Sequence, residues 1–453
     1  MSPIAANRQH AIVMGGSLGG LLAARVLSKH FDKVTIVEKD RVHQVPESRP
    51  GQPQTQHLHG LLAMGLKIMT DYFPDLPAEL VANGASINDF ALSMRWRLYG
   101  GYRSQFKIGF PSTTMSRGLL EHLIRDRVLA IPNLKLLDRT IVKSLQTNPD
   151  RDRIIGIIVE QHDSAPQRSL TADLVVDVTG RSSRSGKWLA DLGYEPPFAS
   201  KVHVHLGYAT RIYRRDPEDP RSHTWILNSP APPQQTTFGG IIPIEGDRWI
   251  VSVGGWHGNW APTTETGFLE FVRGLPSPDI YDIISQSEPL SAIVPYKFPF
   301  SLRRYYERLK RFPSGYLVLG DAVSSFNPTY GQGMSVAALE VVELDRVLTE
   351  NVSPTHLAQT FFQRIAKIID IPWQLAVGED FRFPQTTGIK PLGTDLLNLY
   401  ATWVHRTTLH DPVVGETFLQ VMNLMIQPIC LFHPRIVWRV LRTMLRACNK
   451  STS

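Results

Sequence analysis

A glycine-rich turn near the N-terminus constrains the fold more than any other feature of the 453-residue sequence. The run HAIVMGGSLGGLLAARVLSKHFDKVTIVEKD, residues 10–40, opens with an apolar segment that predicts a buried strand at residues 11–14. A helix is predicted at residues 18–30 and a second buried strand at residues 34–37, with Glu38 at its end. This order of strand, glycine turn, helix, strand and acid predicts a dinucleotide-binding βαβ unit.

The residue types of this turn suit a dinucleotide. Gly15 permits a tight turn, Gly20 lets the helix lie close to the strand, and free N–H groups at the helix N-terminus can bind a pyrophosphate. Ser17 stands where a second glycine is usual, so the phosphate would approach more tightly. Glu38 can accept hydrogen bonds from ribose hydroxyls and disfavours a 2′-phosphate, which leaves NAD and FAD as candidates. The predicted contacts are Gly15, Gly16, Ser17, Leu18, Gly20, Glu38 and Lys39.

A later segment returns to the same predicted sheet. The runs NLKLL, TIVKSLQT and RIIGIIVEQ, within residues 133–161, predict a three-stranded β-meander. Residues 172–189, ADLVVDVTGRSSRSGKWL, then predict a buried strand that carries Asp177 and Gly180 at its C-terminal end.

The third segment is YLVLGDAVSSFNPTYGQGMSVAALE, residues 316–340. It predicts a buried strand followed by Asp321, a loop, and a helix from about residue 334 to residue 349. Ligands of parallel sheets bind at the C-terminal ends of strands, so Asp321 is placed to accept hydrogen bonds from a ribityl chain. Pro328 stiffens the loop, and two glycines let backbone N–H groups approach a planar, electron-accepting ring. These glycines are Gly331 and Gly333.

These three segments, in this order, resemble the class A FAD-dependent monooxygenases, the aromatic hydroxylase family, over residues 11 to about 349. The resemblance implies that Asp321 contacts the ribityl chain and that Asp177 and Gly180 lie near the pyrophosphate. It also implies that Arg117, in TTMSRGLLEHLI, opens a helix beside the phosphates, and that Val142 meets the adenine through its backbone. The residues implied to line the isoalloxazine are Pro328, Gly331, Gly333 and Met334.

Residues 49–62, RPGQPQTQHLHGLL, resemble a segment of bacterial and polyketide-pathway flavin epoxidases, which are distantly related to squalene epoxidases. The runs GYATRIYRR, PIEGDRWIVSVGG and FNPTYGQGMS resemble that subgroup too. The resemblance implies that Arg49 lies near the cofactor. Flavin halogenases share the architecture but usually carry a WxWxIP motif, which this sequence lacks.

The middle of the chain predicts an inserted antiparallel sheet. Residues 202–213 alternate in part like a strand, and residues 237–256 predict a hairpin that turns at Gly246 and Asp247. In the family such a sheet roofs the flavin with the substrate beneath it. Tyr208, Phe238 and Trp256 are candidates to line the substrate space; the alternative is that they are ordinary packing aromatics.

The predicted fold class is α/β, with a Rossmann-like FAD-binding domain, a β-meander, an inserted antiparallel-sheet substrate domain and a helical C-terminal region. The predicted FAD-binding domain is discontinuous and comprises residues 1–195 and 300–350. Residues 196–299 form the predicted substrate domain, and residues 351–453 form the helical region.

The resemblance also implies the chemistry. Hydride from NAD(P)H reduces FAD, O2 forms a C4a-hydroperoxide, and one oxygen atom passes to the substrate in a pocket that excludes water. No polar relay that would deprotonate a phenol is evident, which favours epoxidation of an alkene in an apolar polyene, terpenoid or polyketide-like product of secondary metabolism. Three alternatives stay open: an aromatic hydroxylase, a flavin-dependent reductase or dehydrogenase of a prenyl chain, and a non-enzymatic flavin or lipid carrier.

The C-terminal run HPRIVWRVLRTMLRACNK predicts an amphipathic helix. Its arginines fall on one stripe, and Ile436, Val440 and Met444, with Val437 and Leu441, form an apolar side. Such a helix either packs on its own domain or contacts an anionic membrane surface through residues 433–449. The arginines of the stripe are Arg435, Arg439, Arg442 and Arg446.

Composition narrows the remaining classes. The net charge is +7, but the basic residues are dispersed and no nucleic-acid motif is present. Two cysteines, Cys430 and Cys448, exclude a disulfide framework or a cysteine-rich zinc site. His57 and His59 lack a third ligand of suitable spacing, so no metal site is expected. No apolar run of about 18 residues and no secretion signal are evident, so a cytoplasmic protein is expected, with the membrane contact left open.

Overall fold

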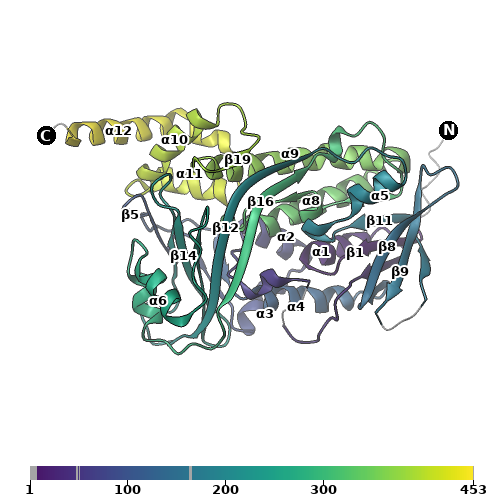
Figure 1. Ribbon diagram of the computed structural model, residues 1–453, viewed down its shortest axis with the longest axis horizontal. Helices are drawn as coiled ribbons and strands as arrows, with labels where there is room; N and C mark the ends of the chain where they lie inside the picture. The colour runs from purple at the N-terminus through teal and green to yellow at the C-terminus, as the bar shows by residue number, and fades with distance from the viewer. Residues whose placement is uncertain (1–7, 47–48, 50, 163–165, 452–453) are drawn as a thin grey trace.

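A computed structural model describes residues 8–46, 49, 51–162 and 166–451, with side chains to residue 447 (Figure 1). The first seven residues, part of the N-terminus expected to lack a secretion signal, lie outside this range, as does the side chain of Cys448. Within the described residues, no helix is both long and apolar enough to cross a membrane.

Five short apolar strands form a parallel sheet in the order β17–β11–β1–β2–β7. The central strand β1 pairs with β11 and β2, so that Met14 lies between Asp177 and Val37. Because all five strands run in one direction, their C-terminal ends meet at one edge, where parallel sheets bind ligands. The bounds are His10–Met14 (β1), Lys33–Val37 (β2), Leu134–Leu137 (β7), Leu174–Asp177 (β11) and Tyr316–Val318 (β17).

The predicted β-meander is present but with a different first and last strand. The NLKLL run is β7, and it pairs with β2 of the parallel sheet rather than with its neighbour in sequence. The helix before β7 returns the chain to the side of the parallel sheet that β2 would otherwise leave unpaired, as in a βαβ crossover. The antiparallel sheet is formed by β8 (Thr140–Thr147), β9 (Ile154–Gln161) and β10 (Arg168–Thr171).

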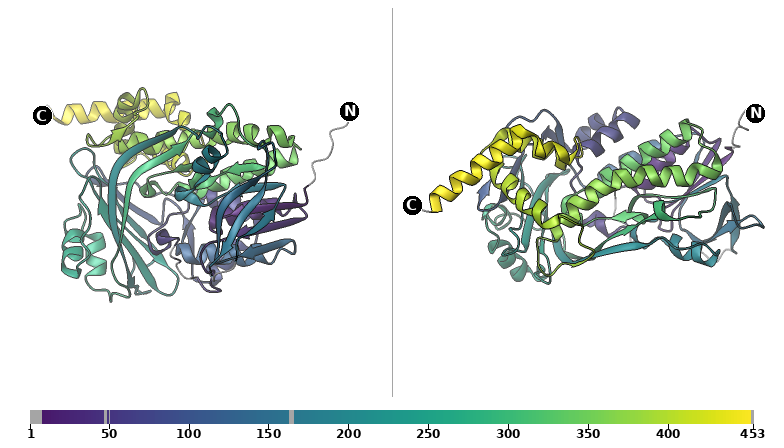
Figure 2. Two further views of the ribbon diagram at one scale, coloured as in Figure 1. Left: turned by 45° about the vertical axis from the view of Figure 1, so that its right-hand side comes forward. Right: turned by 90° about the horizontal axis from the view of Figure 1, so that it is seen from above.

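Four helices pack around the parallel sheet. α1 (Leu18–Leu27) packs against α4 (Arg117–Leu129) and α8 (Gly333–Thr349). α8 in turn packs against α2 (Ala63–Tyr72) and lies beside the long helix α9 (Pro354–Asp380), as Figure 1 and Figure 2 show. The largest cluster of buried apolar side chains joins this sheet to these helices and extends under part of the long antiparallel sheet described next.

A long antiparallel sheet lies beside this body, in the order β18–β16–β12–β15–β14–β13–β4–β5, with β19 also paired to β12. Only the β13–β4 pair is parallel. The predicted hairpin is confirmed: Ile244 pairs with Arg248, and the three-residue turn between them contains Gly246 and Asp247, which both have positive φ. The bounds are Met94–Leu98 (β4), Gly101–Tyr102 (β5), Ala199–Arg214 (β12), Trp225–Asn228 (β13), Thr237–Ile244 (β14), Arg248–Gly255 (β15), Val294–Arg304 (β16), Ser324–Ser325 (β18) and Thr387–Gly388 (β19).

The C-terminal region is helical, as predicted, and lies along one side of the molecule (Figure 1). It contains α9 (Pro354–Asp380), α10 (Thr394–Thr407), α11 (Pro412–Met422) and α12 (Pro434–Ser451). Smaller elements are α3 (Leu76–Ala82), α5 (Ser185–Asp191), α6 (Glu265–Arg273), α7 (Asp279–Ile284), β3 (Ser86–Asp89) and β6 (Pro111–Thr114). The mixed α/β class is confirmed, and the domain boundaries at residues 195, 299 and 350 stay a prediction.

Candidate functional site

The glycine turn between β1 and α1 has the geometry that the sequence predicts. Gly15 has φ +106°, and a Cβ atom there would lie 2.6 Å from the Val178 carbonyl oxygen. A Cβ atom on Gly20 would lie 1.9 Å from the Gly15 carbonyl oxygen, so only glycine fits. The side chain of Ser17, at the N-cap of α1, makes no capping bond, and no acid lies in the first turn. The N-terminus of α1 therefore offers open N–H groups to an anion.

Glu38 ends β2 beside this turn. Its carboxylate accepts hydrogen bonds from the Gly16 N–H (2.7 Å) and the Asp40 N–H (3.0 Å), and its side chain is buried. The neighbouring Lys39 is exposed. Val142 is half-buried at a register shift in β8, two residues beyond Thr140, whose N–H donates to the Glu38 carbonyl. The structure thus places the predicted ribose and adenine contacts along one margin of the turn.

A buried cluster of charges joins Arg49 and Arg117 at the same turn. Both arginines contact Glu121, at 2.6 Å and 3.3 Å. The Ser17 hydroxyl also donates to Glu121 (2.9 Å). Burial opposes ionisation of Glu121, but Arg117 and Arg49, with hydrogen bonds from Ser17 and Gln52, outweigh it and lower its pKa. Glu121 was not predicted, although its spacing of four residues from Arg117 was visible in the sequence.

Two nitrogen atoms of this cluster are suited to bind an anionic group. Arg49 Nη1 and Arg117 Nε are buried and have no hydrogen-bond partner among the described residues. Arg49 Nη1 lies 3.7 Å from Glu38 Oε2, which is too far for a hydrogen bond. Buried donors are rarely left unpaired. The orphaned donors and the open N-terminus of α1 therefore fit a dinucleotide pyrophosphate.

Asp321 follows β17 at the same edge of the sheet, after Gly320, which has φ +67°. Its side chain is accessible, yet protein surrounds it closely enough that burial raises its pKa, against the opposing effect of Arg117 and Arg181. The side chain of Asp321 also lies beside the N-terminus of α8, because a Cβ atom on Gly333 would be 3.7 Å from Asp321 Oδ1.

The loop after Asp321 has the open backbone that the sequence predicts. Pro328 begins a short 3-10 turn, and Gly331 has φ +66°. A Cβ atom on Gly331 would lie 3.6 Å from the Gly60 carbonyl oxygen, so residues near position 60 lie against this loop. Gly333 begins α8, whose N-terminus has no side-chain cap, and Met334 is half-buried beside it. The N-terminus of α8 is thus open toward the space beside Asp321.

Asp177 uses its carboxylate within its own loop. It accepts hydrogen bonds from the Thr179 N–H (2.8 Å), the Thr179 hydroxyl (2.6 Å) and the Ser183 hydroxyl (2.5 Å), and it is fully buried. Gly180 turns the loop with φ +80°. The geometry gives Asp177 the task of shaping this loop, and its predicted contact with the pyrophosphate stays a prediction.

The three aromatic candidates form one cluster on the antiparallel sheet. The ring centroids of Phe238 lie 6.2 Å from Tyr208 and 5.5 Å from Trp256. Tyr296 and Phe383, which were not predicted, extend the cluster at 5.3 Å from Tyr208 and 5.2 Å from Trp256. These members come from residues 208–383, so no local sequence pattern could have joined them.

The two histidines make local contacts beside this cluster. His57 lies 5.0 Å from the Tyr208 ring, and its Nδ1 is hydrogen-bonded to the Thr210 hydroxyl (2.8 Å). Burial lowers the His57 pKa to about 4, so the ring is neutral near pH 7. His59 Nδ1–H donates to the His57 carbonyl (2.9 Å). Among the described residues, no three histidine, cysteine or acidic side chains are grouped to hold a metal.

A buried carboxyl links the glycine loop to the aromatic cluster. Asp380 Oδ1 accepts hydrogen bonds from Asn327 (2.8 Å), the Tyr330 hydroxyl (2.8 Å) and Trp256 Nε1–H (3.2 Å). Asp380 is fully buried, and Oδ2 has no partner among the described residues. Burial raises its pKa to about 7, against the three donors, while nearby Glu379 adds to the increase. Asp380 fixes the loop of residues 327–331 to the aromatic cluster.

Replacing Asp380 by asparagine is expected to stabilise the protein considerably more at pH 8 than at pH 5. The folded chain holds a proton on Asp380 between its ordinary pKa of 3.8 and about 7, whereas the unfolded chain releases it. Stability therefore falls as pH rises through this window, by up to roughly 1.4 kcal/mol per pH unit. Asparagine keeps an acceptor for the three donors and does not ionise.

Melting temperatures of both chains at pH 5 and pH 8 measure this effect. Asp191→Asn is the matched control, because Asp191 is exposed. An Asp380→Asn chain that gains no more at pH 8 than at pH 5 contradicts the expectation.

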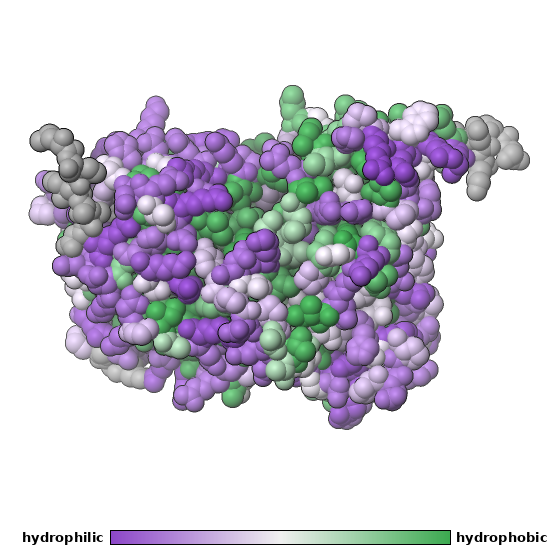
Figure 3. All heavy atoms as spheres, turned by 180° about the vertical axis from the view of Figure 1, so that it is seen from behind, coloured by the Kyte–Doolittle hydropathy of each residue, from purple (hydrophilic) through white to green (hydrophobic). Residues whose placement is uncertain are grey.

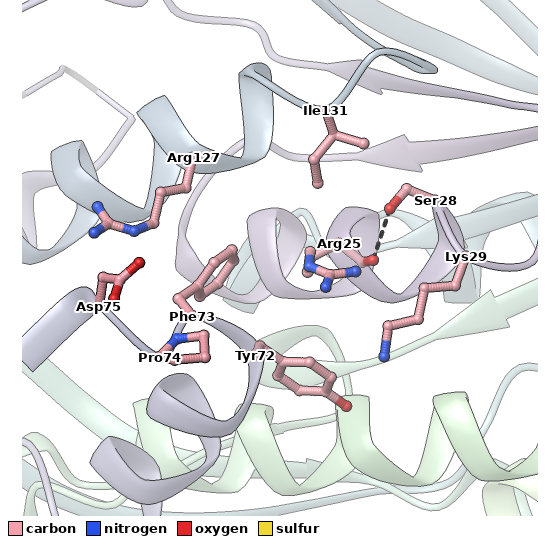
Figure 4. A pocket seen from close by; sticks show the side chains of 9 residues that line it. All are labelled: Arg25, Ser28, Lys29, Tyr72, Phe73, Pro74, Asp75, Arg127 and Ile131. Carbon is pink, nitrogen blue, oxygen red and sulfur yellow. Dashed lines mark hydrogen bonds between the residues drawn. The ribbon is translucent and has the colours of Figure 1, made fainter.

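A surface pocket of about 500 Å³ lies at the opposite end of α1 (Figure 4). Arg25, Lys29 and Arg127 line it, together with Tyr72 and Asp75. α1 runs from Leu18 at the glycine turn to Leu27 near this pocket, so about 14 Å of helix separates the two. The pocket is therefore distinct from the site at the sheet edge.

Sequence comparison finds two informative relatives. Protein Rv3254 of Mycobacterium tuberculosis is 30% identical over 435 residues, which cover 92% of this chain and 90% of that protein. Squalene monooxygenase of Mus musculus is 24% identical over 376 residues, which cover 78% of this chain. The chain spans only 56% of the mouse protein. No protein-family model matches the sequence.

Solved structures share the fold. The flavin-dependent brominase Bmp2 superposes with a TM-score of 0.67 at 14% identity, covering 98% of this chain and 100% of the brominase. The p-nitrophenol 4-monooxygenase PnpA of Pseudomonas putida DLL-E4 superposes with a TM-score of 0.62 at 14% identity, covering 93% and 99%. At such identities the likeness shows a shared fold and leaves the reaction open.

Proposed function

This chain belongs to the class A FAD-dependent monooxygenases, and from that membership we propose that it epoxidises an alkene of an apolar small molecule with NAD(P)H and O2. The proposal rests on the way the candidate cofactor residues and the aromatic cluster lie side by side. The glycine turn, the cluster of Arg49 and Arg117, and Asp321 all lie at the edge of the parallel sheet where its strands end. Asp380 joins the loop of residues 327–331 to the aromatic cluster.

The proposal assigns the two ends of FAD to the two ends of this edge. Arg49, Arg117 and the N-terminus of α1 hold the pyrophosphate, and Glu38 meets the ribose. Asp321 holds the ribityl chain, and residues 328–334 line the ring. When bound, FAD supplies the redox chemistry: it takes electrons from NAD(P)H and activates O2.

The residues of the chain position the substrate and exclude water. Tyr208, Phe238 and Trp256 provide the apolar wall, and neutral His57 adds no charge to it. An alkene needs no deprotonation before oxygen transfer, so an apolar wall suffices. The overall reaction balances as alkene, O2, NAD(P)H and a proton giving epoxide, water and NAD(P)+.

Two comparisons support the alkene over other substrates. Residues 49–62 resemble those of flavin epoxidases, and a related protein is named for squalene, a hydrocarbon polyene. The brominase Bmp2 and the p-nitrophenol monooxygenase PnpA share the fold, so halogenation and aromatic hydroxylation are the competing outcomes to test. The proposal includes a cytoplasmic location with peripheral membrane contact, since an apolar substrate partitions into lipid.

The test supplies the FAD-loaded chain with NADH or NADPH, ¹⁸O2, bromide, and a panel of polyenes and phenols. The expected result is NAD(P)H oxidation that a polyene stimulates, with one ¹⁸O atom in an epoxide. A hydroxylated phenol, a brominated product, or a saturated prenyl chain formed without O2 would each replace the epoxidation proposal. A chain that oxidises NAD(P)H equally with and without every substrate contradicts oxygen transfer.

A further inference from the structure

Exposed apolar side chains gather in the C-terminal region. Residues 389–445 hold ten of the 17 exposed large apolar side chains in the described part of the chain. Leu392 is fully exposed, and Leu396 on α10 is 73% exposed. Exposed apolar side chains that lie together in such numbers are typical of interaction sites. The ten residues, called here the C-terminal apolar surface, are Ile389, Leu392, Leu396, Leu397, Leu399, Ile429, Phe432, Trp438, Leu441 and Leu445.

α12 has two apolar sides, and the helical spacing of apolar residues in the sequence predicted mainly the inner one. Ile436 and Val440 are buried against a small cluster with residues of α10 and α11, so this side packs on the chain's own domain. Leu441, assigned to that side, is instead exposed. With Trp438 and Leu445 it forms an outer stripe at steps of three and four residues, which share one face of a helix. The inner side explains why α12 is held in place, and the outer stripe is left unpartnered.

Arginines flank the outer stripe. Arg435, Arg442 and Arg446 are exposed, and Arg439 pairs with Asp411 at 2.7 Å. Arg442 and Arg446 have no ion pair among the described residues. These four arginines line a groove of about 310 Å³ together with His410, Asp411, Trp438 and Thr443. Among the described residues, Asp411 is the only acid that lines it, so the groove is positively charged.

The two helices that carry this surface lie together. α10 packs against α12, and α12 projects from the body of the molecule (Figure 1 and Figure 2). Seen from behind, hydrophobic and hydrophilic residues alternate along the upper edge of the molecule, on the side of the C-terminus (Figure 3). Apolar and basic residues on one projecting edge match a planar surface better than an enclosed protein groove.

We infer that the C-terminal apolar surface docks on a bilayer that contains anionic lipid, with its apolar side chains in the acyl boundary and Arg442 and Arg446 on lipid phosphates. An exposed apolar stripe beside an arginine stripe is the pattern of helices that lie in the membrane interface. Trp438 lies at the border between the two stripes, where tryptophan is favoured. The arginines favour anionic lipid over the other candidate partners, because neutral lipid and an apolar protein surface have no negative charge to pair with them.

The inference deepens the proposed membrane contact and does not depend on the reaction. The surface begins at Ile389, six residues after Phe383, which stacks on Trp256 in the aromatic cluster. If the proposed apolar substrate is correct, docking brings that cluster to the phase in which such a substrate dissolves.

Vesicle flotation of the full chain tests the inference. Vesicles of phosphatidylcholine are compared with vesicles that also contain phosphatidylglycerol. The expected result is flotation with the anionic vesicles that salt weakens. The variants Arg442→Glu/Arg446→Glu and Trp438→Ser/Leu441→Ser/Leu445→Ser are each expected to lower the partition constant at least roughly tenfold.

Matched controls separate a specific surface from general stickiness. Arg151→Glu/Lys310→Glu changes the net charge equally at exposed positions elsewhere, and Leu92→Ser removes an apolar side chain that is 48% exposed. Both controls are expected to float as the unmodified chain does. Flotation that both test variants retain overturns the inference, as does failure to float with anionic vesicles. Self-association that the serine variant abolishes, without vesicle binding, would assign the surface to a second copy. Oxidation activity in vesicle-free buffer reports separately on the proposed function.

Discussion

Replacing Asp321 by alanine is expected to weaken FAD binding by roughly 30-fold or more. Asp321 is the acid that follows β17, and its carboxylate lies close enough to Arg117 and Arg181 for both to oppose the rise in its pKa. A carboxylate that accepts hydrogen bonds from a ligand in such a place contributes about 2–5 kcal/mol when its removal leaves the partners unpaired. The lower figure corresponds to about 30-fold in Kd. Fluorescence titration of the FAD-free chain with FAD measures the change.

Two further variants make the result specific. Asp321→Asn keeps an acceptor but loses the charge, so its Kd is expected to lie between those of the unmodified and alanine chains. Asp71→Ala removes an exposed acid that pairs with Lys67 and is expected to bind FAD normally. A folded Asp321→Ala chain with unchanged Kd would remove Asp321 from the flavin site and leave the arginine cluster as its remaining support.

Features formed by neighbouring residues were predictable from sequence. The glycine turn at Gly15 and the hairpin at Gly246 and Asp247 depend on backbone conformations that few residues adopt, so their sequence signals are strong. The NLKLL strand shows the limit. Its apolar pattern identified a strand correctly, but such a pattern does not say which sheet a strand joins, and here it joins β2.

Features formed by distant residues were not predictable in the same way. Asp380 gains its role from Asn327, Tyr330 and Trp256, which reach it from 50 to 124 positions away. The two sides of α12 illustrate the same limit, because helical periodicity gives faces but not which face the domain buries. Burial depends on the neighbouring helices, and those neighbours are a tertiary property.

Replacing Glu121 by glutamine is expected to destabilise the folded chain by about 3–5 kcal/mol, the usual result of leaving buried charges unpaired. Glu121 is 2% exposed and contacts Arg49, Arg117 and Arg125 at 2.6, 3.3 and 3.8 Å. Glutamine keeps the shape and one acceptor oxygen but removes the negative charge that the three arginines share. The difference in melting temperature between the FAD-free chains measures the effect, and added FAD is expected to restore part of it, since phosphate replaces the lost charge.

Glu79→Gln is the matched control, because Glu79 also pairs with an arginine of α4, Arg127, but its side chain is 44% exposed. Such a surface pair contributes about 1 kcal/mol or less. The stabilisation that Glu121 provides also depends on pH. The pKa of Glu121 is lowered in the folded chain, so its stabilisation is present above its ordinary pKa of 4.5 and is lost as pH falls through the folded value. The gap between the unmodified and Glu121→Gln chains should therefore narrow only on acidification below about pH 4.5. A gap that is no larger than the one for Glu79→Gln, or that is unchanged in acid, would show that the arginines do not depend on this carboxylate.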